Sequence, residues 1–374
     1  MENKKALSSF LIFALPILLF TFQSCIPPLA NSFEDVEDGI YLEKSPIVSA
    51  PAPDSSVKVM TWNIRFGIGR GPWFGDACGY KVVYSESEVL ANLHLIAQKI
   101  EQLKPDIVLL QEVDIQSTRS GYVDELQWLL DNTYFNYAVY GSQWQVGYIP
   151  SDGLGRMNET NVILSRWPLD GAKRYQLALR TDQIAPEQYL YERCCMVETR
   201  VVIPGFEDLY VINIHASAFA QDNTRVKHLA AFKKEMDRIK ALGSLLVAGG
   251  DLNSIPPGSD STDFCEEHKC TGEIVHSKEV DPYHKEGMFY DPETDGMRNL
   301  YNAYTNVIPL STYLANQSAY FTQTPVPEMS WDRVLDYMFT NSRWVAGASS
   351  VRQECVMESD HVPVCGALII RKSP

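Results

Sequence analysis

The chain has 374 residues, 45% of them apolar, which is enough for one large α/β domain or two smaller domains with a sizeable core. Its formal net charge of −15 excludes a protein that coats polyanions through a basic surface, because such binding depends on counterion release. A metal-dependent nuclease is still allowed, since a bound divalent cation can reverse the sign of the local field.

Residues 1–25 are predicted to be an export signal. Lys4 and Lys5 give a positive start, and Phe10–Phe22 is nearly all apolar but too short for a comfortable membrane span. Cys25 follows a small residue, which resembles a bacterial lipoprotein signal in which this cysteine carries the lipid anchor. An ordinary cleaved secretory signal and an uncleaved anchor are the alternatives. We therefore expect an exported protein of the bacterial cell envelope, either membrane-anchored or secreted.

Residues 26–56 are predicted to be a flexible tether. The segment is rich in proline, its charges are mostly acidic, and no periodicity is sustained along it. The catalytic domain is expected to begin at the strand that starts at Val57 and to run to residue 371.

Export would place the eight cysteines of the chain in an oxidising compartment. If Cys25 is lipidated, an odd number remains, so at least one is unpaired. Cys265 and Cys270 are close enough in sequence for a small disulfide loop. Together with His268 they offer three zinc ligands and no fourth nearby, so a zinc site is the weaker alternative to a disulfide or free thiols.

From Val57 onward, apolar strands alternate with helices. Apolar residues recur at helical spacing in three segments, which predicts helices at 86–103, 122–130 and 224–242. Apolar, β-branched runs predict strands that start at Val57 and at 106–110, 161–164, 195–203, 209–214, 245–248, 334–339, 344–351 and 362–370. The strands at 195–203 and 209–214 are expected to form a hairpin, and the strand at 245–248 is expected to lead into a Gly249-Gly250 turn.

The order of these elements predicts the architecture. Residues 255–330 contain loops and short elements, and we interpret them as an insertion at the rim of the active site. Strands connected by helices, together with strand pairs that lack helices, predict an α/β fold. The expected form is a four-layer sandwich, in which two mixed β-sheets pack face to face between helices.

Six short polar motifs lie where apolar runs end. They are Thr61-Trp62-Asn63, Gln111-Glu112, Asn213-Ile214-His215, Gly250-Asp251-Leu252-Asn253, Leu335-Asp336-Tyr337 and Ser359-Asp360-His361. Acids, amides and imidazoles at the ends of several strands are what an α/β scaffold needs to build a hydrolytic metal site. Each motif taken alone also fits a turn or an exposed loop. The prediction therefore depends on the ordered set.

Together with the segment Asn161-Val-Ile-Leu-Ser-Arg166, these motifs occur in an order that resembles the endonuclease/exonuclease/phosphatase superfamily over about residues 57–370. That superfamily includes pancreatic-type deoxyribonucleases, abasic-site endonucleases, inositol polyphosphate 5-phosphatases and secreted sphingomyelinases. The resemblance implies a phosphoric ester hydrolase that depends on a divalent metal ion, Mg²⁺ or Mn²⁺.

The resemblance also implies roles for single residues. Glu112 would be the main metal ligand, supported by Asn63 and Asp360. His361 would be the general base, and Asp336 would orient it. A buried acid bonded to one ring nitrogen fixes the tautomer and raises the basicity of the other nitrogen.

Three more residues have implied roles at the phosphate. Asp251 would hold the attacking water or a second metal, and Asn253 would donate to a phosphoryl oxygen. His215 would hydrogen-bond the phosphate and help to protonate the leaving oxygen; it is typical of the deoxyribonuclease and sphingomyelinase branches. Arg166 could touch phosphate, although a structural ion pair fits it equally well.

The main functional expectation is in-line hydrolysis of a phosphodiester or phosphomonoester by a histidine-activated water. A secreted nuclease and a sphingomyelinase-like phospholipase are alternatives within this class, although 255–330 carries few of the basic residues that a nuclease needs at its rim. A catalytically retired binding protein and a thiol- or zinc-based enzyme are the alternatives outside it. The expected partners are a phosphate-ester substrate, nucleic acid among the options, and a membrane through the lipid anchor. A monomer is expected.

Overall fold

The computed structural model of the protein describes residues 29–30, 32–76, 79–218, 220, 222–264, 290, 293–324 and 331–373. The expected export signal and the loop between Cys265 and Cys270 lie outside these residues. Within the described ranges, no helix combines the length and the apolar character that a membrane crossing needs.

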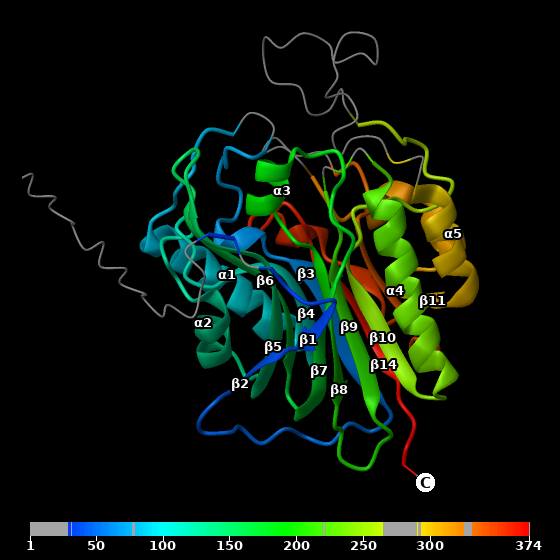
Figure 1. The fold of residues 1–374 in the computed structure, drawn as a ribbon. Coiled ribbons are helices and arrows are strands. Elements are labelled where there is room, and N and C mark those ends of the chain that lie inside the picture. Colours follow the sequence, from blue (N-terminus) through cyan, green and yellow to red (C-terminus); the bar gives the residue numbers. More distant parts are fainter. Residues whose placement is uncertain are drawn as a thin grey trace, which may run out of the picture.

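Two seven-stranded mixed sheets pack face to face, and helices cover their outer faces (Figure 1). The first sheet has the order β13 (Ser350–Val351), β14 (Val364–Ile369), β3 (Ser56–Asn63), β4 (Ile107–Asp114), β6 (Gly155–Ser165), β5 (Tyr137–Ile149) and β2 (Ile40–Glu43). The second has the order β1 (Val36–Asp38), β7 (Leu169–Gln176), β8 (Cys195–Val201), β9 (Leu209–His215), β10 (Leu245–Asp251), β12 (Asp336–Thr340) and β11 (Thr305–Asn306). Strands β3 and β4 pair in parallel, as do β9 and β10.

The helices complete a four-layer sandwich, as the sequence predicts. Helices α1 (Glu86–Leu103) and α2 (Glu125–Asn132) pack on the first sheet, and α4 (Thr224–Ala241) and α5 (Thr294–Ala303) pack on the second. Shorter helices lie in the connections. They are η1 (Arg65–Gly67), α3 (Ala185–Leu190), α6 (Leu310–Ala315), η4 (Gln317–Tyr320) and η5 (Gln353–Cys355).

The central strands are buried on both faces because successive side chains point to opposite sides of a sheet. In β3, Met60 and Trp62 pack beneath the helices of the first sheet, whereas Val57 and Val59 pack against the second sheet. Strand β10 divides its side chains between two cores in the same way. Burial on both faces explains why these strands are unbroken apolar runs in the sequence.

Helix starts follow local capping chemistry. Helix α1 has the predicted bounds, and Ser85 and Glu88 form a capping box at its start. Helix α2 begins at Glu125 rather than at the predicted Tyr122, because Tyr122 has a positive φ of 60° and Asp124 caps the helix.

Residues 36–43 are not part of a free tether. Strand β1 pairs with β7 and strand β2 pairs with β5, so the segment closes one edge of each sheet. The prediction of a tether throughout 26–56 is therefore wrong for these residues. Both strands are very short and mostly exposed, so they lack the apolar run or alternation that identifies a strand in a sequence.

The described part of the predicted insertion, which was expected to be loops and short elements, includes a helix and a strand of the main fold. Helix α5 packs on α4, and β11 extends the second sheet beside β12. Met297 and Leu300 of α5 are fully buried in the core beneath these helices. Residues 294–306 therefore belong to the outer helical layer and its sheet rather than to a rim loop. Two buried apolar residues in a ten-residue helix give a weak periodic signal.

Two further predictions need correction. The strand predicted at 344–351 is reduced to β13 and a single bridge from Trp344 to Leu368, and Gly347 between them has a φ of 75°.

The predicted Gly249-Gly250 turn is also wrong, because β10 continues to Asp251. A Cβ atom on Gly250 would lie 1.9 Å from the carbonyl oxygen of Ile214. Glycine here allows β9 and β10 to approach each other beside the motif.

We expect Gly250→Ala to lower the free energy of unfolding by about 3 kcal/mol or more, because the added methyl group would be strained at a positive φ and would also collide with backbone. Gly205→Ala is the matched control. Its φ is 81° but nothing lies within 4 Å of the added Cβ, so only backbone strain of about 1–2 kcal/mol is expected. Urea unfolding followed by circular dichroism measures both losses. Equal losses would contradict the role of close approach.

Candidate active site

Ends of strands from both sheets deliver polar side chains to one place. His215 of β9, Asp251 of β10 and Asp336 of β12 are direct neighbours in the register of the second sheet. In the first sheet, Asn63 of β3 lies beside Gln111 of β4. Each of these residues is an even number of positions from a side chain of its own strand that packs between the sheets. The strand period therefore turns all five toward the same inter-sheet space.

Asn63 joins the two sheets at the site. Its Nδ2 donates to Oε1 of Glu112 at 2.8 Å and to Oδ2 of Asp251 at 3.1 Å. Glu112 lies at an irregularity of β4, where the register with β6 shifts between Leu110 and Val113. Its φ of 54° is in the left-handed region, which brings its carboxylate to Asn63. Bulges and strained residues of this kind cluster at functional sites.

His361 and Asp336 form the expected acid–imidazole pair. Nδ1 of His361 is 2.8 Å from Oδ2 of Asp336, and its Nε2 is 3.6 Å from Oδ2 of Asp251. Burial acts to lower the pKa of His361, but the charges of Asp336 and Asp251 outweigh it and hold this pKa well above its usual value. The loop is fixed to β3, because Ser359 Oγ donates to the Asn63 carbonyl oxygen and Trp62 Nε1 donates to the His361 carbonyl oxygen.

His215 lies on the other side of Asp251. Its Nε2 is 3.6 Å from Oδ2 of Asp251 and 3.8 Å from Oε1 of Glu112. Asn253 also contacts this aspartate, since its backbone N–H donates to Asp251 Oδ1 at 2.9 Å while its Nδ2 donates to the Ala216 carbonyl oxygen. Asp251 is thus held by Asn253 and Asn63, with one imidazole nitrogen on each side.

Asp360 belongs to the same electrostatic group but has its own partners. Oγ of Ser359, whose hydrogen goes to the Asn63 carbonyl oxygen, lies 3.2 Å from its Oδ1, and Nε of Arg65 lies 3.7 Å from its Oδ2. Burial acts to raise the pKa of Asp360, but the charge of Arg65 and that of His361 leave it below the usual value. Its negative charge in turn contributes to the raised pKa of Glu112. The structure therefore gathers all eight residues that the sequence predicts for the site.

The acids of this group repel each other. Burial, followed by the charges of Glu159 and Asp360, raises the pKa of Glu112 to about 7. Burial and the charge of Asp336 raise the pKa of Asp251 to about 6, against the opposing effect of His361. Carboxylate and amide oxygens are the ligands that hard divalent cations prefer, and a cation would relieve this repulsion. The carboxylates of Glu112 and Asp360 thus fit a Mg²⁺ or Mn²⁺ ion. Asn63 differs from its predicted role as a ligand, because its Nδ2 faces Glu112 and its Oδ1 accepts from the backbone N–H of Arg65.

A different group could also be taken for a metal centre. Ligand atoms of Asp251, Asp336 and His361 lie within 4.8 Å of one another. Two of these residues, however, already bond each other through His361 Nδ1 and Asp336 Oδ2. The acid–imidazole pair therefore accounts for this group without a metal ion.

Amides beneath the site were part of the motifs but received no role from the sequence. Gln111 Nε2 donates to Asn213 Oδ1 at 2.6 Å and to Thr61 Oγ1 at 3.1 Å. Asn213 Nδ2 donates to the carbonyl oxygens of Leu110 and Val162 in the first sheet. These bonds satisfy polar groups buried between the sheets and fix the spacing of the strands that carry the site.

A second group of charged residues beside the site was not found from the sequence. Arg119 is buried under the ring of Phe66, 3.6 Å from its centroid, and forms ion pairs with Asp114 and Glu159. Burial and the charges of Glu159 and Glu112 raise the pKa of Glu192 to about 8. The available signal is the polar run at 158–161 in the middle of β6, directly before the apolar run at 162–164.

Two alternatives are decided by contacts. Nη1 of Arg166 lies 3.0 Å from Oδ1 of Asp106, so the structural ion pair is the correct interpretation of this arginine.

Cys194 and Cys195 are free and buried near the site. Burial raises the pKa of both thiols, which opposes the thiolate form that a thiol-based enzyme needs.

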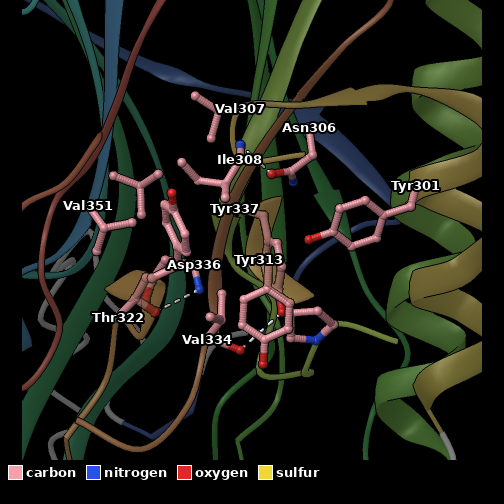
Figure 2. Close-up of a pocket in the computed structure, with 13 residues that line it drawn as sticks. Tyr301, Asn306, Val307, Ile308, Tyr313, Thr322, Val334, Asp336, Tyr337 and Val351 are labelled. Carbon is pink, nitrogen blue, oxygen red and sulfur yellow. Dashed lines mark hydrogen bonds between the residues drawn. The ribbon is translucent and has the colours of Figure 1, made fainter. Parts of the chain in front are cut away.

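A small cavity lies behind the acid–imidazole pair (Figure 2). Its volume of about 10 Å³ could hold a single water molecule and no substrate. Asp336 lines it together with tyrosines that include Tyr301, Tyr313 and Tyr337. Oδ1 of Asp336 finds no hydrogen-bond partner among the described residues, whereas Oδ2 faces the histidine.

Comparison with known structures supports the fold. A protein from Beutenbergia cavernae, described as an endonuclease/exonuclease/phosphatase, superposes with a TM-score of 0.55 at 20% identity, covering 85% of this chain and 72% of that one. A family protein from Leptotrichia buccalis superposes with a TM-score of 0.50 at 13% identity, covering 83% of this chain and 99% of that one. At these identities the likeness concerns the fold alone. No curated protein is significantly similar to the chain in sequence.

Sequence comparison defines the class. The model of the endonuclease/exonuclease/phosphatase family matches residues 60–361. The chain therefore belongs to this family, whose members are hydrolases that act on phosphoesters. The matched range runs from the motif at the end of β3 to His361, so it contains all the residues of the site described above.

The raised pKa of Glu112 predicts how stability depends on pH in the cation-free chain. The folded state holds this proton up to about pH 7, whereas the unfolded chain releases it near 4.5. The folded state therefore binds more protons between these values, and the free energy of unfolding should fall by about 3 kcal/mol as the pH rises through them. Urea unfolding in the presence of a chelator measures this slope.

Glu112→Gln should remove that part of the fall. Glu187→Gln is the matched control, because Glu187 is exposed on α3. It should retain the wild-type slope. A slope unchanged by Glu112→Gln would show that Glu112 is ionised in the folded chain at acid pH.

Proposed function

We propose that the protein is a divalent-metal-dependent phosphoesterase that hydrolyses a phosphodiester by in-line attack of a water molecule. The observation that carries the proposal is the position of Asp251 Oδ2, which lies 3.6 Å from Nε2 of both His361 and His215. Glu112 is joined to the same oxygen through Asn63. A water-activating imidazole, a second imidazole and a candidate cation ligand therefore surround one small region.

Glu112 and Asp360 would hold a Mg²⁺ or Mn²⁺ ion, and Asn63 would support Glu112 through its Nδ2. The ion would supply Lewis acidity at a phosphoryl oxygen. The repulsion that raises the pKa of Glu112 supports this assignment.

His361 is proposed as the general base. When the imidazole is neutral, Nδ1 donates to Asp336 and Nε2 is left to take a proton from water. The positive charge of a bound cation would oppose the acids that raise the pKa of His361 and would favour this neutral form. Asp251 lies beside that nitrogen and can accept the second hydrogen of the same water. Positioning of this kind lowers the entropic cost of the attack.

His215 and Asn253 are proposed to bind phosphoryl oxygens. His215 Nε2 points into the region between Asp251 and Glu112. Asn253 Nδ2 donates one hydrogen to the Ala216 carbonyl oxygen and has a second hydrogen to offer. Fixed donors aimed at developing negative charge lower the barrier, because they do not have to reorganise during the reaction.

The substrate is proposed to be a phosphodiester, with a monoester, nucleic acid and sphingomyelin as the alternatives that a substrate panel would test. We further propose that the chain acts outside the cytoplasm as a monomer, attached to a membrane through Cys25.

His361→Ala should lower kcat for bis-p-nitrophenyl phosphate by about 10²–10⁴-fold, because the general base is lost. Asp336→Asn should lower kcat as well, since an amide does not hold the imidazole in the required tautomer. His94→Ala is the control, because His94 is exposed on α1 and far from the site in the fold. If His361→Ala kept turnover near that of the wild type, the assignment of the base would fail.

Removal of divalent cations tests the metal. Chelation by EDTA should abolish turnover, and added Mg²⁺ or Mn²⁺ should restore it, because the proposed ligands are hard oxygen donors. Glu112→Ala should raise the Mg²⁺ concentration needed for half-maximal activity. Restoration by Zn²⁺ alone would favour a zinc enzyme and contradict the proposal.

A further inference from the structure

The proton of His215 can be placed from the hydrogen bonds around it. Its Nε2 faces Asp251 and Glu112, while its Nδ1 lies 2.9 Å from Nε2 of Gln143. A neutral imidazole carries its single proton on one nitrogen, and the partner of the other nitrogen determines which one. The question is therefore whether Gln143 donates to Nδ1 or accepts from it.

One end of the network fixes the amide oxygen of Gln143. The carbonyl oxygen of Cys195 can only accept, and it lies 2.9 Å from Nδ2 of Asn161, which must therefore be a nitrogen. The same Nδ2 donates to Oε1 of Gln143 at 3.0 Å. The atom of Gln143 that faces Asn161 is thus its oxygen, and the atom that faces His215 is its nitrogen.

The other end gives the same answer independently. Arg119 donates to Glu159 Oε2 at 2.6 Å and to both carboxylate oxygens of Asp114 at 2.9 Å. Paired with a guanidinium in this way, the carboxylate oxygens of Glu159 act as acceptors. Its Oε1 contacts Nε2 of Gln143, so that atom is again a donor. The amide has two hydrogens, of which one goes to Glu159 and the second points to His215 Nδ1.

We propose that Gln143 is a positioning residue that holds His215 as the neutral tautomer with its proton on Nε2. Nδ1 accepts from Gln143 and cannot carry a proton as well. Gln143 and Asn161 are both fully buried, so water does not offer another partner. The two imidazoles of the site then have opposite roles: neutral His361 has its proton on Nδ1, facing Asp336, and offers an unprotonated Nε2, whereas His215 presents an N–H to the site.

The tautomer of His215 adds detail to the proposed phosphoesterase function, and its consequence for catalysis rests on that proposed function. A neutral imidazole that gave up its Nε2 proton would become an imidazolate, which is far too unstable to form. His215 therefore stabilises a phosphoryl oxygen by a hydrogen bond and keeps its proton. The role as proton donor to the leaving oxygen, which the family resemblance implies, does not hold for this chain under the proposal.

The deciding measurement is a long-range ¹H–¹⁵N spectrum of the full chain labelled with ¹⁵N-histidine, at neutral pH. The resonances of His215 are assigned as those that are missing from the spectrum of the His215→Gln variant. We expect Nδ1 of His215 at the shift of an unprotonated ring nitrogen and Nε2 at that of a protonated one. A protonated Nδ1 on His215 would overturn the proposal.

Gln143→Glu reverses the direction of the bond, because a carboxylate accepts from Nδ1. The proton should move to Nδ1, and kcat should fall by about 10²-fold, as expected for the loss of one donor to a phosphoryl oxygen. Gln98→Glu is the matched control on the exposed face of α1 and should change neither the spectrum nor kcat. A folded Gln143→Glu protein whose proton stays on Nε2 would contradict the assignment. If this variant does not fold, the wild-type spectrum decides alone.

The spectrum also separates this inference from the proposed function, because it needs no turnover. The chain could show the expected tautomer and yet hydrolyse no phosphoester. That result would support the role of Gln143 and contradict the proposed phosphoesterase function. The chain could instead hydrolyse a phosphoester while His215 carries its proton on Nδ1. That result would support the proposed function and contradict the role of Gln143.

Discussion

The bonds from one amide, that of Asn63, to Glu112 and Asp251 are the interaction on which the site depends. Asn63 and Glu112 belong to the first sheet, and Asp251 belongs to the second. Each carboxylate would repel the other, and the amide between them lets both be held at the same boundary. A buried polar group without a partner is costly, so the bonds constrain how the two sheets meet.

The apolar core makes this meeting possible. Strands β3, β4, β9 and β10 are packed on both faces, which leaves their side chains little freedom to change register. The inter-sheet core ends where the polar residues begin, at Gln111 and Asn213, whose amides bond across the gap between the sheets. The change from apolar to polar side chains along each strand therefore determines where the core between the sheets ends and the site begins.

Charge divides the site into two parts. Arg119 compensates Asp114 and Glu159, and this fixed ion-pair network leads through Gln143 to His215. Glu112 bonds Asn63 instead, and burial together with the charge of Glu159 raises its pKa. One part therefore consists of bonded groups that orient a donor, and the other consists of acids that favour a cation. The proposed hydrolysis would use both parts, because negative charge develops on oxygens during the reaction.

The sequence predicted the sandwich, the central strands and helices α1 and α4, because apolar runs and capping residues act over a few positions. It named the eight site residues through the order of their motifs and the family resemblance; the structure brings these residues together, and their roles stay predictions. It did not find Gln143 and Glu159, whose roles come from contacts across strands and sheets. It also misplaced residues 36–43 and 294–306, since short edge strands and a helix with two buried residues have weak periodicity. Residue type shows that a side chain can carry a proton or hold a cation. Which atom carries the proton depends on the donors and acceptors that the folded chain brings to it.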